Sequence, residues 1–208
     1  MGRAETPHIT LTFERAGFTV PRYVIDIDRN GRGSYTGEQS TPDVRGVATG
    51  PATQPFERSF AISVATADNI FALTQQLDHF NVNCAAKAKD VADIGTKTLR
   101  YAGPDAAGFC TFLYSDNKAV TELTEMLHGI TETMDAGREL ERLHRYDRLG
   151  LDDAMATLTK EAADGRALEM GTIAPTLRAI AGDSEVMRRV RTRAAELLSL
   201  IPPDAAAR

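Results

Sequence analysis

RYVIDIDRNGRGSYTG, residues 22–37, decides the fold of this chain because it predicts a β-hairpin. Apolar side chains at positions 23, 25 and 27 alternate with the carboxylates of Asp26 and Asp28, so one face of an extended strand is apolar and the other is polar. Asn-Gly follows at positions 30–31, and this dipeptide tolerates the positive φ angles of a tight hairpin turn. Residues 33–37 then supply the return strand.

Strand patterns continue on both sides of this hairpin. Residues 9–15 alternate apolar and polar side chains, and residues 58–64, 96–101 and 109–114 also have strand character. The last of these is apolar on both faces, which predicts a central strand. Residues 39–57 are rich in Ser, Thr, Pro and Gly, which predicts a long loop, and a helix from Thr66 to about Phe80 is expected to pack on the sheet.

The second half of the chain has helical periodicity. Apolar residues recur at three and four positions from about residue 117 to residue 147, which predicts one long helix. A shorter helix is expected after Gly150, with Gly165 in a left-handed C-terminal cap. Two further helices should lie between residues 173 and 201, where Pro202 ends the pattern.

These patterns predict an α+β fold, in which an antiparallel sheet with packed helices is followed by an all-helical C-terminal extension. The expected division is a sheet-and-helix domain over residues 1–147 and a helical extension over residues 148–208. A chain of 208 residues can bury a substantial core without needing a disulfide scaffold.

Composition excludes several functional classes. The net charge of −5 and the absence of a strongly basic cluster argue against nucleic-acid binding, which requires clustered positive charge. No apolar run approaches the roughly 18 residues of a membrane span. The first residues lack the apolar core of a signal peptide, so we expect a periplasmic or secreted protein if a signal peptide has been removed, and otherwise a cytoplasmic one.

Two parts of the chain resemble known families. Residues 173–201 look like one HEAT-type helical hairpin, with Pro175, Asp183, Arg188 and Leu197 near the expected positions. A solenoid needs at least three such units, so we expect a single hairpin and no repeat array. Residues 8–115, through ITLTFER, PRYVIDID and the Asn-Gly turn, resemble a bacterial strand-rich domain of unknown function that is common in exported proteins. That resemblance implies an exported protein without assigned chemistry, although the cysteine pair typical of the pattern is absent before Pro21.

Asp26, Asp28 and Asn30 match the first half of a calcium-binding loop, in which alternate oxygen ligands surround the ion. The second half does not match. The bidentate glutamate should stand at Gly37, whereas Glu38 comes one residue later. We therefore expect an ordinary hairpin with solvated carboxylates and no bound metal.

Cys84 and Cys110 allow two arrangements. In an exported protein they could meet as a disulfide if the loop that carries Cys84 folds back over the sheet. Two separate buried thiols are favoured slightly, because position 110 suits a packed strand residue. Cys84 with His79 is also conceivable as a nucleophile and base, but no third orienting group is suggested.

The remaining polar residues indicate no catalytic motif. The four histidines, at positions 8, 79, 128 and 144, lack metal-ligand spacing. The arginines at 188, 189, 191 and 193 spread around the polar side of a helix, and Glu185 stands four residues before Arg189 as a favourable helical pair. Since no phosphate loop, dinucleotide fingerprint or Gly-x-Ser-x-Gly motif is present, no cofactor is expected.

The sequence thus favours a non-catalytic binding or scaffolding protein, whose partner is another protein. The alternative is a hydrolase-type enzyme with a site in a cleft between sheet and helices. Convergent polar groups with shifted pKa values would favour the enzyme, and an exposed apolar surface would favour the binding protein.

Overall fold

The structure is a computed structural model, and it describes residues 6–40, 53–86 and 94–202. It has the expected α+β fold, with a six-stranded antiparallel sheet and C-terminal helices. The chain folds into two compact units. The first comprises residues 1–60 and 64–125, and the second comprises residues 61–63 and 126–208.

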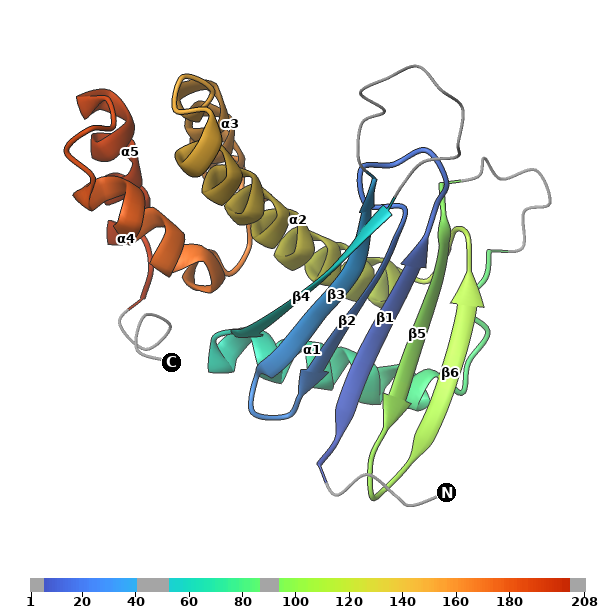
Figure 1. The fold of residues 1–208 in the computed structure, drawn as a ribbon. Helices are drawn as coiled ribbons and strands as arrows, with labels where there is room; N and C mark the ends of the chain where they lie inside the picture. The colour runs from blue at the N-terminus through green and yellow to red at the C-terminus, as the bar shows by residue number, and fades with distance from the viewer. Residues whose placement is uncertain (1–5, 41–52, 87–93, 203–208) are drawn as a thin grey trace, which may run out of the picture. The chain divides into compact units, whose positions relative to one another are not determined.

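The sheet belongs to the first unit and contains six strands in the order β4-β3-β2-β1-β5-β6. Figure 1 shows these strands side by side, with β4 and β6 outermost and α1 crossing one face. The bounds of the elements in this unit are β1 His8–Glu14, β2 Arg22–Asp28, β3 Arg32–Ser40, β4 Thr53–Ala61, α1 Val64–Gln76, the 3₁₀ helix η1 Asp78–Phe80, β5 Thr96–Ala102 and β6 Ala107–Phe112.

The predicted hairpin is confirmed as β2 and β3. Ile25 lies opposite Tyr35 in the antiparallel register, and both side chains are fully buried. Of the Asn-Gly pair, Gly31 takes the expected positive φ, at +77°, whereas Asn30 does not. The alternation in the sequence therefore places one face of the hairpin in the core and leaves Asp26 on the other face.

The core of the first unit lies between the sheet and its helices. Inward side chains from the central strands, such as Leu11 and Leu99, are fully buried. Ile70 of α1 is also fully buried, and the ring of Phe71 lies edge-on to Tyr101 of β5 at a centroid distance of 6.5 Å. The apolar side chains whose spacing predicted this helix are therefore the ones that pack against the sheet.

Three predictions for the first unit need correction. The strand expected at 109–114 is not central, because β6 is an edge strand and the Phe109 side chain is 69% exposed. The loop expected at 39–57 is partly strand, since β4 begins at Thr53; residues 41–52 lie outside the described residues. The helix expected from Thr66 begins at Val64, and η1 follows it as a separate 3₁₀ turn.

The long helix is confirmed as α2, Lys118–Tyr146. The division of the chain, however, falls between residues 125 and 126, inside this helix, and not at residue 147. The reason is that Leu140 and Leu143 share a core with the later helices α3, Leu151–Ala163, α4, Ala174–Gly182, and α5, Arg188–Ser199. The second half of α2 therefore belongs to the helical unit.

The helical unit contains its own apolar core. Met155 of α3, Leu177 of α4 and Val190 of α5 are fully buried in it. Pro175 stands in the first turn of α4, where a missing N–H costs nothing, and the short 3₁₀ helix η2, Met170–Ile173, precedes it. Gly165 has φ +71° just beyond α3, as expected for a left-handed cap. Among the described residues, no helix combines the length and apolar character that crossing a membrane requires.

Candidate functional site

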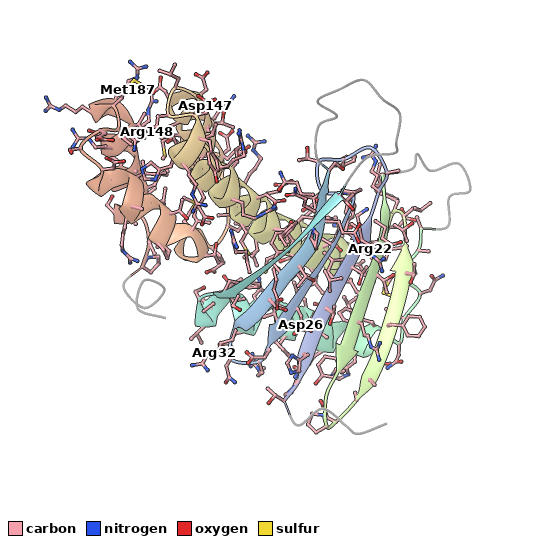
Figure 2. All side chains as sticks on the ribbon, viewed as in Figure 1. Arg22, Asp26, Arg32, Asp147, Arg148 and Met187 are labelled. Atoms are coloured by element: carbon pink, nitrogen blue, oxygen red, sulfur yellow. A yellow bond between two sulfur atoms is a disulfide. The ribbon has the colours of Figure 1, made fainter. Side chains whose placement is uncertain are left out.

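The carboxylates of the calcium candidate are occupied by protein donors. Asp26 Oδ1 lies 3.0 Å from His8 Nδ1, and Asp26 Oδ2 accepts a 2.8 Å hydrogen bond from Thr10 Oγ1. Asp28 Oδ1 accepts the backbone N–H groups of Asn30 and Arg32 at 2.8 and 2.9 Å. Figure 2 shows Asp26 on the sheet and Arg32 at its rim. Within residues 6–40, 53–86 and 94–202, no three His, Cys, Asp or Glu side chains are grouped as metal ligands.

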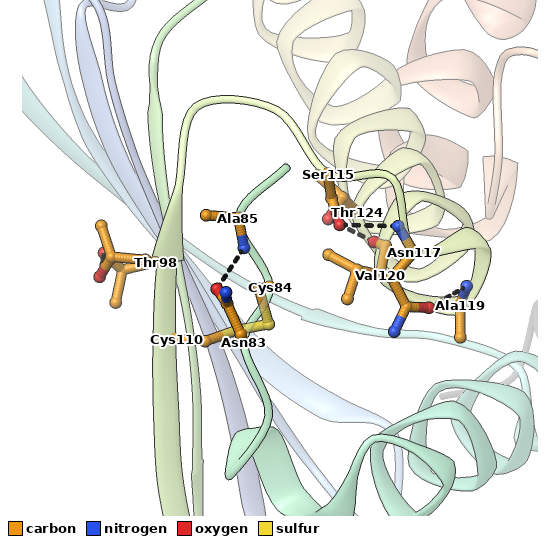
Figure 3. The surroundings of a disulfide bond; sticks show 11 residues. Asn83, Cys84, Ala85, Thr98, Cys110, Ser115, Asn117, Ala119, Val120 and Thr124 are labelled. Atoms are coloured by element: carbon orange, nitrogen blue, oxygen red, sulfur yellow. Dashed lines mark hydrogen bonds between the residues drawn. A yellow bond between two sulfur atoms is a disulfide. The ribbon is translucent and has the colours of Figure 1, made fainter. Parts of the chain in front are cut away.

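Cys84 and Cys110 form a disulfide, with a Cα–Cα distance of 5.8 Å. The preference for two separate thiols was therefore wrong. The segment after η1 returns over the sheet, as Figure 3 shows, and the N–H of Ala86 donates a 2.9 Å hydrogen bond to the carbonyl of Tyr114. Because Cys84 has no free thiol, the conceivable pair of a Cys84 nucleophile and a His79 base is excluded.

His79, Tyr101 and Asp105 form a polar cluster at one end of the β5–β6 hairpin. Tyr101 Oη donates a 2.7 Å hydrogen bond to Asp105 Oδ1, and His79 Nε2 lies 3.7 Å from Asp105 Oδ2. The imidazole and phenol rings are 4.5 Å apart, and η1 holds His79 at φ +53° between Asp78 and Phe80, which also have positive φ. This backbone conformation is costly for residues other than glycine, so the surrounding contacts must maintain it.

The hydrogen bond between Tyr101 and Asp105 shifts the pKa values of both groups. Burial, followed by the hydrogen bond to Asp105, raises the pKa of Tyr101 to about 12. The same hydrogen bond lowers the pKa of Asp105 from its ordinary value. At neutral pH the phenol therefore keeps its proton and the carboxylate stays charged. Neither group is tuned to exchange protons near pH 7, which a general acid or base requires.

The helical unit has a polar groove between the end of α2 and α4. Its volume is about 550 Å³, and it is lined by Glu141, His144, Arg145, Arg148, Pro175, Thr176, Ala179 and Asp183. His144 Nε2 lies 2.8 Å from Asp183 Oδ2, and Thr176 donates a 3.0 Å hydrogen bond to Glu141. The hydrogen bond with His144 is the main cause that lowers the pKa of Asp183. These groups pair with one another across the groove.

The arginines of α5 are arranged differently from the expected helical pair. Arg189 Nε and Arg193 Nη1 both lie 2.8 Å from Asp152 Oδ1 at the start of α3. Glu185 pairs instead with Arg148, because α5 begins only at Arg188 and Glu185 lies outside it. Hydrogen bonding to Arg189 lowers the pKa of Asp152. Arg189 and Arg193 thus tie α5 to α3 through a single carboxylate.

The edge strand β6 carries the most exposed large apolar side chain among the described residues of the first unit. Phe109 is 69% exposed, and Leu113 and Tyr114, just beyond the strand, are 39% and 48% exposed. Ala107 and Thr111, on the same face as Phe109, are also exposed. The sequence AGFCTF of this strand contains no charged residue and no proline.

The hydrogen-bond pattern of the β5–β6 hairpin determines which backbone groups face the free edge. The N–H of Gly103 donates to the carbonyl of Ala106 at 3.0 Å, which makes these two residues a hydrogen-bonded pair. Hydrogen-bonded and non-bonded pairs alternate along an antiparallel ladder, so Gly108, Cys110 and Phe112 bond to β5. The N–H and C=O groups of Ala107, Phe109 and Thr111 therefore point away from β5, toward the edge.

The opposite edge of the sheet differs in composition. Strand β4 contains Pro55, Glu57 and Arg58, and the side chains of all three are exposed. Proline and charged residues on an edge strand prevent another strand from pairing with it. The β6 edge has none of these residues. Among the described residues, β4 thus carries residues that discourage strand addition, and β6 carries none.

Comparisons with known proteins return no relatives: no family model, no curated protein and no solved structure matches the chain. A function for this chain must therefore be inferred from its own residues and their geometry. The sequence pattern did not indicate the β6 edge, because it placed residues 109–114 at the centre of the sheet. One signal of an exposed face was present in the sequence. Thr111 and Ala107 share a face with Phe109, and neither is a large apolar residue.

Proposed function

We propose that this chain is a non-catalytic binding protein that engages another protein chain through strand β6. The observation that carries the proposal is the contrast between the two edges of the sheet. Residues 107–112 offer an uncharged strand with an exposed phenylalanine and outward backbone groups, whereas β4 carries Pro55, Glu57 and Arg58. An open edge of this kind is a template for an added strand, in which backbone hydrogen bonds provide affinity.

An oxidising compartment fits the same proposal. The disulfide between Cys84 and Cys110 would persist in the periplasm or outside the cell, and thiols in the bacterial cytosol are usually kept reduced. Export is also what the resemblance to the strand-rich domain implies. The disulfide further restrains Cys110 in the middle of β6, so the edge is held in its extended conformation before a partner arrives.

The hydrolase alternative has less support. Its most specific residue pair was Cys84 with His79, and Cys84 is in a disulfide. In the described residues, Asp105, Asp183 and Asp152 each pair with a neighbouring side chain, Tyr101, His144 and Arg189 respectively, which is typical of structural ties. A partner-binding edge accounts for an exposed feature that an enzyme would not require.

Photo-crosslinking tests the proposed function. A photoreactive phenylalanine analogue replaces Phe109 in the full chain, expressed in the source organism, and the control places the same analogue at Ser59 on β4. We expect a defined protein adduct from position 109 and none from position 59. Absence of any adduct at position 109, or the same adducts at both positions, would contradict the proposal.

A further inference from the structure

We propose that the strand added to β6 comes from a second copy of this chain, so that two sheets join edge to edge about a two-fold axis at Phe109. This inference rests on the proposed function, and it names the partner. It starts from the three residues whose backbone groups face the edge, Ala107, Phe109 and Thr111. These residues are spaced evenly about Phe109.

Antiparallel pairing of two copies satisfies every outward group of the strand. Phe109 would lie opposite Phe109 of the second copy, and Ala107 would lie opposite Thr111 in both directions. All three would be hydrogen-bonded pairs, because each places its N–H and C=O groups toward the partner. The two exposed Phe109 rings would lie on the same face and contact each other. Such an aromatic cross-strand contact stabilises the pairing of the two strands.

Charge permits this pairing. No charged residue stands in β6, and the cross-strand neighbour of Phe109 on β5 is Arg100. In the pair, the two Arg100 residues would be separated by three strand spacings, about 14 Å. That distance exceeds the Debye length of about 8 Å at physiological salt, so their repulsion is largely screened.

The second edge explains why pairing would stop at two copies. Each copy offers one open edge, β6, and its other edge, β4, is protected by Pro55, Glu57 and Arg58. Pairing of the same element in both copies is isologous and closes after one step. The contact involves one short strand per copy, which is smaller than the roughly 1,200–2,000 Å² of a stable interface. We therefore expect a weak, reversible dimer.

Sedimentation of the purified, oxidised full chain measures this association. We expect a monomer–dimer equilibrium between about 1 μM and 1 mM protein, the range of a weak complex. Thr111→Lys places two lysines in the paired strands and should weaken dimerisation at least tenfold, about 1.4 kcal/mol. The matched control Ser59→Lys adds the same charge to the β4 edge and should leave the equilibrium unchanged.

Engineered cysteines test the register independently. Phe109→Cys should form an intermolecular disulfide on mild oxidation, because its two copies would have Cα atoms about 5.5 Å apart. Ala107→Cys alone should not, since its two copies would be about 14 Å apart along the strands. Ala107→Cys mixed with Thr111→Cys should cross-link. Circular dichroism and peptide mapping check that each variant keeps its fold and its bond between Cys84 and Cys110.

The outcomes separate the inference from the proposed function. A chain that stays monomeric at about 1 mM, or a dimer weakened equally by Thr111→Lys and Ser59→Lys, would overturn the second-copy pairing. If photo-crosslinks from position 109 join only other proteins, the inference fails and the binding function stands. If position 109 cross-links to nothing, both fail.

Discussion

Cys110 stands in the middle of the edge strand β6, and its disulfide joins it to Cys84, in the segment that follows η1, across a Cα–Cα distance of 5.8 Å. The two cysteines are 26 positions apart in the sequence. Both side chains are buried, at 2% and 7% exposure, so the bridge is part of the packed interior. It restrains the strand that we propose as the binding edge.

Loss of the disulfide should lower stability. Replacing Cys84 and Cys110 together with serine releases a restraint that contributes about 3 kcal/mol for a loop of this size on the chain-entropy model. Guanidinium unfolding with and without a reductant measures the effect. The double variant should be insensitive to reductant, and alkylation of the unfolded native chain without reduction should label no thiol. Labelling of both cysteines would show that the bridge is absent.

Tyr101 should make stability depend on alkaline pH. Its pKa is raised from 10.0 to about 12, so the folded state favours the protonated phenol. The resulting stabilisation is fully present below pH 10.0, and it is lost as the pH rises toward 12. Urea unfolding across this window should show a steeper loss for the native chain than for Tyr101→Phe. Tyr114→Phe, which alters an exposed ring, should behave like the native chain.

Asp28 should act as an acceptor for the hairpin turn and not as a calcium ligand. Asp28→Ala leaves the N–H groups of Asn30 and Arg32 without their carboxylate, at a cost of about 0.5–1.5 kcal/mol. Calcium at millimolar concentration should leave the melting temperature of the native chain unchanged. Calorimetric heat that saturates near one ion per chain, and that Asp28→Ala abolishes, would be the contrary result.

Asp183 should stabilise the helical unit in a manner that acid removes. Its pKa is lowered by His144, by the N–H of Glu185 and by Arg148, so its charged form is favoured in the folded state. That contribution is present above the ordinary aspartate pKa of about 3.9, and it is lost as the pH falls through the lowered pKa. Asp183→Asn should therefore be less stable than the native chain at about pH 5, and the difference should disappear as the pH falls through the lowered pKa of Asp183. Asp153→Asn is the matched control. A difference independent of pH would rule out the carboxylate charge as its cause.

The core of the helical unit should depend on α5. Leu197 is 2% exposed within the core that also contains Met155 and Leu158 of α3. Leu197→Ala should cost about 2–5 kcal/mol of unfolding free energy. Leu200→Ala, at a residue that is 67% exposed, should stay within about 0.5 kcal/mol of the native value. Equal effects of the two substitutions would show that α5 is an appendage without a role in the core.

Local periodicity by itself determined most of the secondary structure. Alternation around Ile25 and the Asn-Gly turn sufficed for the β2–β3 hairpin, and apolar residues at three and four positions sufficed for α2. These elements follow from interactions between residues close in sequence, which a pattern records directly. The antiparallel sheet and the helical second half, and thus the fold class, were predictable for the same reason.

Only the tertiary structure decided the position of β6 in the sheet, the meeting of Cys84 with Cys110, and the ties of Asp105, Asp152 and Asp183. Each depends on where the chain returns after a turn, and strand order is not recorded in the periodicity of a single strand. The apolar pattern of residues 109–114 is compatible with a central strand and with an edge strand. The disulfide depends on η1, where Asp78, His79 and Phe80 take positive φ and direct the following residues back over β6. That path is maintained by packing around Phe80, which is fully buried, and packing is a property of the folded chain.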